Sequence, residues 1–183
     1  MVGVAFFPTA LSHLLRMPLS ELTDRRVDLE VLLGQEAVEL RQKICEAGGM
    51  QQRVQLLENF LLKRLHKFDY QPNVLDKVVD HIIEHSGMVS VSQLADQAAL
   101  SNKQFRCRFY EKTGLSPKLY CRIKRFNMVI GNTYSKLPNW SDAVYNLGYY
   151  DQSHLIREIR KFSGKKPSEF SSYQRHMASQ LNL

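Results

Sequence analysis

The C-terminal half of the chain contains the stretch LGYYDQSHLIREIRKFSGKKPSEF, which runs from Leu147 to Phe170. About fifty residues earlier the chain reads AALSNKQFRCRFYEKTGLSPKLY, from Ala98 to Tyr120. Each stretch has a short turn, a basic segment with apolar residues at helical spacing, and then a glycine, a proline and an aromatic residue. The chain therefore carries one structural unit twice, and this repeat decides the fold.

The two copies align residue by residue with a single insertion. Ala99 aligns with Gly148 at an offset of 49, whereas Gly114 aligns with Gly164 at an offset of 50. The second copy therefore has one extra residue in its turn. The apolar anchors, four residues apart in each copy, are Phe105 and Phe109 in the first and Leu155 and Ile159 in the second. A short helix, a tight turn and a second, basic helix are the parts of a helix-turn-helix unit.

Residues typical of helix starts and helix ends recur along the chain from Val74 onward and predict an all-α fold there. Ser90 with Gln93 and Ser101 with Gln104 have the spacing of capping boxes, in which each side chain pairs with the other residue's backbone N–H. Proline at the first helical position predicts a long helix over Pro117–Ser135, about 28 Å at 1.5 Å per residue. Further start signals are Asn139 and Asp151, and further stop signals are Gly87, Gly114, Gly148 and Gly164.

The first 72 residues predict a small, mostly helical segment. The alternation of Val2, Val4 and Phe6 before Pro8 is typical of a short strand. Helices are expected over residues 10–16 and 35–47, the second ended by two glycines. A third helix is expected in the stretch QQRVQLLENFLLKRLHKF.

An apolar stripe follows one face of that third helix. Its members, at helical spacing, are Val54, Leu57, Leu61, Leu65 and Phe68. This face must be buried, either against the preceding helix or in a homodimer through the Val54–Phe68 helix.

The charge of the chain is unevenly distributed. The net charge is +7 and the isoelectric point is about 9.4. Residues 1–72 hold nine basic and nine acidic side chains, whereas residues 73–183 hold sixteen basic and nine acidic ones. The excess of positive charge therefore lies in the part of the chain that contains the repeat. This favours a polyanionic partner, and nucleic acid is favoured over a membrane surface. A solvated basic face without a partner is the alternative.

The cysteines and the absence of long apolar runs bear on the compartment. Cys45, Cys107 and Cys121 are odd in number and lack paired spacing, which argues against a disulfide framework and a zinc ribbon. We find no convincing signal peptide and no apolar stretch long enough to span a bilayer. We therefore expect a cytoplasmic protein.

The stretch VSVSQLADQAALSNKQFRCRFYEKTGLSPKLY, followed by LGYYDQSHLIREIRKFSGKKPSEF, resembles the AraC/XylS-type DNA-binding domain of bacterial transcription regulators. The resemblance covers about Val74 to Arg175. It implies two helix-turn-helix subdomains joined by a long central helix, with both recognition helices on one face of the duplex, about 34 Å apart. We expect this domain over residues 73–175, after a truncated sensor or linker segment, 1–72, and before a tail, 176–183.

The N-terminal residues carry a second resemblance. The stretch GVAFFPTALSHLLRMPLSELTDRRVDLEVLLG is similar to the segment that joins a sensor domain to the DNA-binding domain in one branch of this family. The sensor, usually a β-rich barrel, does not fit in some seventy residues. The chain is therefore expected to be a fragment or a regulator without its sensor.

The resemblance also assigns residues to DNA by position. The residues it directs at base edges are Lys103, Arg106, Cys107, Gln152, Ser153, Ile156 and Arg157. Those it places at phosphates are Asn102, Lys118, Arg122, Lys165 and Lys166. It implies double-stranded DNA as the ligand, RNA polymerase as a further partner, and no cofactor, metal or catalytic residue.

Three other functions have weaker support. The stretch HIIEH matches the H-x-x-E-H pattern of zinc peptidases at His81, Glu84 and His85, but a third ligand and a cleft are missing, and a polar helix face explains it better. A protein-protein module built on the helices between residues 35 and 68 would bind DNA weakly and without sequence preference. Cysteine-based DNA repair needs a zinc-bound cysteine cluster, which three scattered cysteines do not supply.

Overall fold

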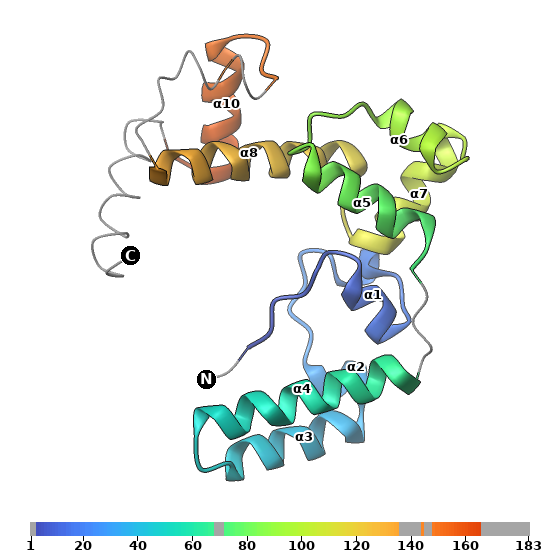
Figure 1. Cartoon of the computed structure of the whole chain (residues 1–183), viewed down its shortest axis with the longest axis vertical. Coiled ribbons are helices and arrows are strands. Elements are labelled where there is room, and N and C mark those ends of the chain that lie inside the picture. The colour runs from blue at the N-terminus through green and yellow to red at the C-terminus, as the bar shows by residue number, and fades with distance from the viewer. Residues whose placement is uncertain (1–2, 68–71, 136–143, 145–147, 166–183) are drawn as a thin grey trace. The chain divides into compact units, whose positions relative to one another are not determined.

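The computed structural model describes residues 3–67, 72–135, 144 and 148–165, and these residues are helical with irregular connections and no strand (Figure 1). The helices are α1 (Ala10–Leu15), the short 3-10 helix η1 (Leu19–Leu22), α2 (Leu29–Leu33), α3 (Gln35–Glu46), α4 (Met50–Lys67), α5 (Val74–Glu84), α6 (Val91–Gln97), α7 (Asn102–Thr113), α8 (Pro117–Ser135) and α10 (Gln152–Ser163). The all-α prediction is confirmed. No helix in the described ranges is long and apolar enough to cross a membrane.

Several predictions lie outside the described residues. They concern Val2, Phe68, the helix expected to start at Asn139, Lys166, Pro167 and the tail 176–183.

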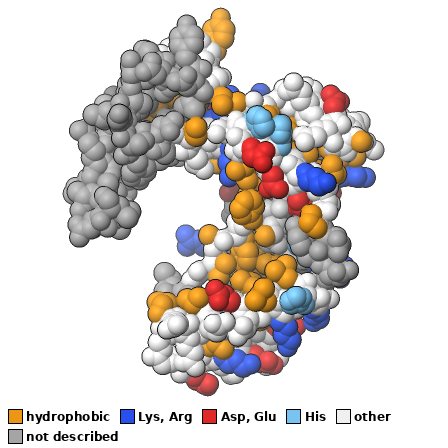
Figure 2. Space-filling model, viewed as in Figure 1, with side chains coloured by type: hydrophobic (Ala, Val, Ile, Leu, Met, Phe, Trp, Pro, Cys, Tyr) orange, Lys and Arg blue, Asp and Glu red, His pale blue; other side chains and the backbone are white. Residues whose placement is uncertain are grey.

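The strand predicted near the N-terminus is wrong. Residues 3–7 adopt no regular structure, and Val4, Phe6 and Phe7 are exposed. A single strand leaves its backbone N–H and C=O groups unpaired, so alternation without a partner strand does not make a sheet. Apolar side chains are visible on the surface of this part of the molecule in Figure 2.

The chain forms two compact units, which divide α5 and α6 between them. The first takes in Met1–Val79 and Ala95–Pro117, and the second takes in Asp80–Leu94 and Lys118–Leu183. Each unit contains one of the two basic helices of the repeat, α7 in the first and α10 in the second.

In the first unit, α3 and α4 form a hairpin, with the two helices side by side (Figure 1). Arg64 of α4 joins three elements, because it pairs with Glu36 of α3 and its Nη2 donates to the carbonyl of Leu14 at the end of α1, 3.1 Å away. The apolar stripe on α4 is only half covered by these neighbours. Leu57, Leu61 and Leu65 are partly buried and Val54 is 40% exposed, so the neighbouring helices of the chain bury only part of this face.

The first unit also has an aromatic core beneath α7. The side chains of Phe105 and Phe109 are fully buried, with ring centroids 5.6 Å apart. Val78 and Val79 are buried at the adjoining end of α5. Burial of each large apolar side chain is worth roughly 1.5–3 kcal/mol, so these positions hold α7 in place rather than read DNA.

In the second unit, α10 packs against α8. Phe126 of α8, Tyr149, and Leu155 and Ile159 of α10 form one buried cluster. Phe162 packs against its edge, with its ring centroid 5.1 Å from that of Phe126. The apolar anchors predicted for the second copy therefore form a closed core.

Candidate nucleic-acid interface

The basic helix of the first copy, α7, begins at the predicted capping box. The backbone N–H of Gln104 donates to Ser101 Oγ at 3.3 Å, and the backbone N–H of Ser101 donates to Gln104 Oε1 at 3.2 Å. The predicted contact residues Asn102, Lys103, Arg106 and Cys107 are all exposed. The buried Phe105 and Phe109 occupy the opposite face, so the N-terminal half of α7 presents its polar side chains to solvent.

The C-terminal end of α7 is held by the N-terminal segment. Gly114 ends the helix at a φ of 73°, a conformation that favours glycine. The hydroxyl of Thr23, just after η1, donates to the carbonyl of Gly114 at 2.7 Å. η1 packs directly on α7. The helix is thus fixed at the end that does not carry the predicted contact residues.

A partly buried ionic cluster reinforces this attachment. Asp76 at the start of α5 lies 3.2 Å from His13 Nε2 of α1 and 3.6 Å from Lys112 Nζ of α7. Burial alone would raise the pKa of Asp76, but hydrogen bonds from Asn73, Thr9 and His13 and the charge of Lys112 lower it. Asp76 is therefore a carboxylate that ties three helices together.

The basic helix of the second copy, α10, has the same arrangement of exposed and buried side chains. Asp151 caps it by accepting the backbone N–H of His154 at 2.6 Å. The predicted contact residues Gln152, Ser153, Ile156 and Arg157 are all exposed. Leu155 and Ile159 are fully buried on the other face.

The repeat extends to individual hydrogen bonds in the two turns. Leu100 N–H donates to Ala95 C=O at 3.0 Å, and Tyr149 N–H donates to Val144 C=O at 3.2 Å, at the offset of 49. The residue between, Ala99 or Gly148, has a positive φ of 53° or 66°. Each turn therefore closes in the same way, although alanine tolerates this conformation less well than glycine.

A hydroxyl side chain lies at the C-terminal end of both basic helices, a feature that the sequence analysis missed. Thr113 Oγ1 donates to Phe109 C=O at 2.8 Å and accepts from Leu115 N–H at 3.2 Å. Ser163 Oγ does the same with Ile159 C=O at 2.7 Å and Lys165 N–H at 3.2 Å. The available signal was a hydroxyl residue directly before the glycine in both copies.

The residues assigned to phosphates have different surroundings. Lys118 is exposed at the second position of α8, where the helix N-terminus adds a favourable field for an anion. Lys165 is partly buried directly after α10, and Asn102 is the first residue of α7.

Arg122 has a partner within the protein. Its Nε and Nη2 donate to the two carboxylate oxygens of Glu158 at 2.9 and 2.6 Å, and its guanidinium lies 5.3 Å from the ring centre of Phe162. Burial alone would raise the pKa of Glu158, but hydrogen bonds and charge from Arg122 lower it. The resemblance assigned the Arg122 guanidinium to a phosphate, but in the structure this guanidinium is already paired with Glu158. We therefore leave Arg122 out of the proposed DNA contacts. Glu158 was missed because its partner is 36 residues away in the sequence.

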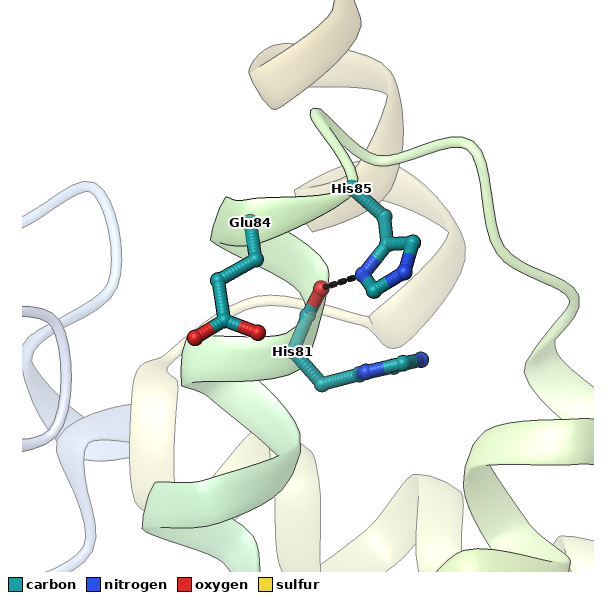
Figure 3. Close-up of side chains that lie close together, drawn as sticks. All are labelled: His81, Glu84 and His85. Carbon is teal, nitrogen blue, oxygen red and sulfur yellow. Dashed lines mark hydrogen bonds between the residues drawn. The ribbon is translucent and has the colours of Figure 1, made fainter.

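The residues of the H-x-x-E-H pattern do come together. The ligand atoms of His81, Glu84 and His85 all lie within 4.8 Å of one another on α5 (Figure 3). Glu84 and His85 are exposed and His81 is half-buried, which agrees with the prediction of a surface position.

Comparison with known proteins gives one match. Residues 94–173 match a family model described as a helix-turn-helix domain. No curated protein and no solved structure shows significant similarity to the chain. The matched range begins within α6 and contains all of α7, α8 and α10, and therefore both basic helices of the repeat. Residues 94–173 are thus similar to helix-turn-helix domains of the AraC type, which bind DNA in transcription regulators.

Proposed function

We propose that this protein binds a specific double-stranded DNA sequence, with α7 and α10 reading two adjacent segments of the major groove. The observation that carries the proposal is the shared design of the two helices. Each is anchored by buried apolar side chains on one face and presents exposed polar side chains from its N-terminal half on the other. Helix-turn-helix proteins read base edges with this part of the recognition helix.

The exposed side chains have the chemistry for direct readout. Arg106 and Arg157 can each donate two hydrogen bonds to O6 and N7 of guanine. Gln152 can pair with N6 and N7 of adenine, and Ile156 offers an apolar contact to a thymine methyl group. We assign Lys103, Cys107 and Ser153 to the same surface, because they are exposed on the same two helices.

Phosphate contacts would set the register of the domain on DNA. We assign them to Asn102, Lys118, Lys165 and Lys166, since amide and ammonium groups near helix N-termini and turns suit phosphate oxygens. Neutralisation of about six phosphates should reduce the affinity roughly a thousandfold between 50 and 200 mM salt.

Each part of the chain has its own role in this proposal. Residues 73–175 bind DNA in the bacterial cytoplasm and perform no chemistry, residues 1–72 hold the end of α7, and residues 176–183 form a tail. RNA polymerase is a further partner that the resemblance suggests. The half-covered stripe on α4 is the surface we assign to a homodimer, and sedimentation at micromolar concentration would show a monomer if this assignment is wrong.

Selection of binding sites from random duplex DNA, with the full chain, tests the proposal. We expect two blocks of preferred bases with centres about one helical turn apart, and an affinity at least about a thousandfold above that for random duplex. A single short block would restrict reading to one helix. Enrichment of no sequence, with weak salt-sensitive binding alone, would favour the protein-protein module.

A further inference from the structure

Three metal-ligand side chains at the C-terminal end of α5 and in the turn after it are not used by the proposed DNA-binding function. His81 and His85 are four residues apart and Glu84 lies between them, so all three project from one turn of the helix. Their ligand atoms lie within 4.8 Å of one another, as Figure 3 shows. A peptidase centre at these residues would need a cleft and a third ligand, whereas simple ion binding does not need a cleft.

The ring of His85 is already oriented for ligation. Its Nδ1 lies 2.9 Å from the carbonyl oxygen of His81. Because a carbonyl oxygen only accepts hydrogen bonds, Nδ1 must carry the proton, and the lone pair is left on Nε2 (Figure 3). A histidine that donates one ring nitrogen to a backbone carbonyl and offers the other to an ion is the usual arrangement at metal sites.

The second imidazole, that of the half-buried His81, lies close to the first. The ring centroids of His81 and His85 lie 4.1 Å apart, with the ring planes tilted by 44°. Zinc bonds of 2.0–2.1 Å in a tetrahedral arrangement place ligand atoms about 3.3 Å apart. Glu84 is exposed, so rotation of its side chain can bring its carboxylate toward the two imidazoles while the hydrogen bond from His85 Nδ1 to the His81 carbonyl is kept.

The backbone beneath the site is rigid. α5 ends at Glu84, His85 begins the turn that follows, and Ser86 and Gly87 in this turn have positive φ values of 51° and 75°. A Cβ atom on Gly87 would lie 2.1 Å from the carbonyl oxygen of Cys121 in α8, so the two backbones are in direct contact within the second unit. The unpaired carbonyls of a helix C-terminus also favour a cation nearby.

We propose that His81, Glu84 and His85 bind one divalent transition-metal ion of the zinc, nickel and copper group at the end of α5. Two imidazole nitrogens and one carboxylate oxygen suit these ions and not magnesium or calcium, which prefer oxygen ligands alone. Solvent completes the coordination, since the site is on the surface. The bound ion joins successive positions of the last turn of α5 and so stabilises that turn against fraying. The inference does not depend on the proposed DNA recognition.

Zinc titration of the full chain by isothermal calorimetry tests the site, with His66→Gln as the matched control because His66 is an exposed histidine on α4. We expect one zinc ion per chain at about 100 µM free zinc. His81→Gln and His85→Gln should each weaken binding tenfold or more, Glu84→Gln should weaken it less, and His66→Gln should leave it unchanged. Millimolar magnesium should not compete.

A second measurement on the unmodified chain removes any dependence on how the variants fold. Bound zinc should protect His81 and His85, but not His66, from acylation by diethyl pyrocarbonate, as read by mass spectrometry of peptides. Absence of zinc binding, equal binding by His81→Gln and His85→Gln, or equal acylation with and without zinc would each overturn the proposal.

Discussion

Replacement of Glu158 by glutamine removes one charge from the bidentate pair that joins α8 and α10. In the protein, both carboxylate oxygens accept hydrogen bonds from Arg122, and the side chains of Glu158 and Arg122 are only 10% and 20% exposed. Glutamine has nearly the same shape but offers one acceptor oxygen and no charge. The variant therefore leaves the guanidinium with half of its hydrogen bonds and without a counter-ion.

The expected loss of stability is about 2 kcal/mol. Removal of one member of a fully buried ion pair costs about 3–5 kcal/mol, because the other charge stays buried. Water reaches part of the guanidinium here and glutamine keeps one acceptor, so the lower figure is appropriate. The double variant with Arg122→Met and Glu158→Leu should lie within about 1 kcal/mol of the unmodified protein, since no buried charge is then left unpaired.

Urea unfolding followed by circular dichroism measures this difference. With a slope of about 1–2 kcal/mol per molar urea, Glu158→Gln should lower the urea midpoint of the second unit by about 1–2 M. Glu39→Gln, at an exposed position on α3, should change stability by less than about 0.5 kcal/mol. A loss for Glu158→Gln no larger than that for Glu39→Gln would refute the view that the pair holds α10 on α8.

The same pair makes stability depend on acidity. The folded-state pKa of Glu158 lies below its ordinary value of 4.5, because Arg122 outweighs the effect of burial. The stabilisation is therefore complete above about pH 4.5 and is lost as the pH falls through the folded-state pKa. The difference between the unmodified protein and Glu158→Gln should shrink below pH 4.5, and a difference that grows there would contradict the reasoning.

Three further variants test the DNA contacts and the backbone. Arg157→Ala should cost about 1–3 kcal/mol at one base pair of the selected site and relax the preference there; an equal loss on every duplex would identify a phosphate contact instead. Lys118→Ala should weaken all duplexes alike and reduce the salt slope by about one, whereas a base-selective loss would reverse that assignment. Gly87→Ala should destabilise the protein by more than about 2 kcal/mol, because of its positive φ and the contact with Cys121, while Gly49→Ala, with open space around it, should be near neutral in the same thermal unfolding assay.

The helices that the sequence predicted best are those whose ends are set by local chemistry. The capping box at Ser101, the proline at the start of α8 and the glycines that end α7 and α10 each act within a few residues. Such signals are readable without knowledge of the fold. For the same reason, the repeat predicted α7 and α10 and the apolar side chains that each of them buries.

The contacts that the sequence did not predict join residues far apart in the chain. Arg122 and Glu158 are 36 residues apart in the sequence, and His13 and Asp76 are 63 apart. The helical periodicity of a short segment therefore cannot predict either pair. The predicted strand failed for a related reason, because alternation describes one strand and says nothing of a partner. The stripe on α4 predicted an apolar face correctly but not how much of it α1 and α3 cover.

The hydrogen bond from Thr23 to Gly114 has a practical consequence for dissecting the protein. A Cβ atom at Gly114 would come within 2.9 Å of Thr23 Oγ1 and 3.1 Å of the Leu19 carbonyl oxygen, so η1 fills the space beside the glycine. A fragment cut at residue 73 would expose this seam to water and would separate Asp76 and Lys112 from His13. DNA affinities measured on such a fragment would therefore belong to an α7 that has lost these contacts, and they would not describe α7 in the intact protein.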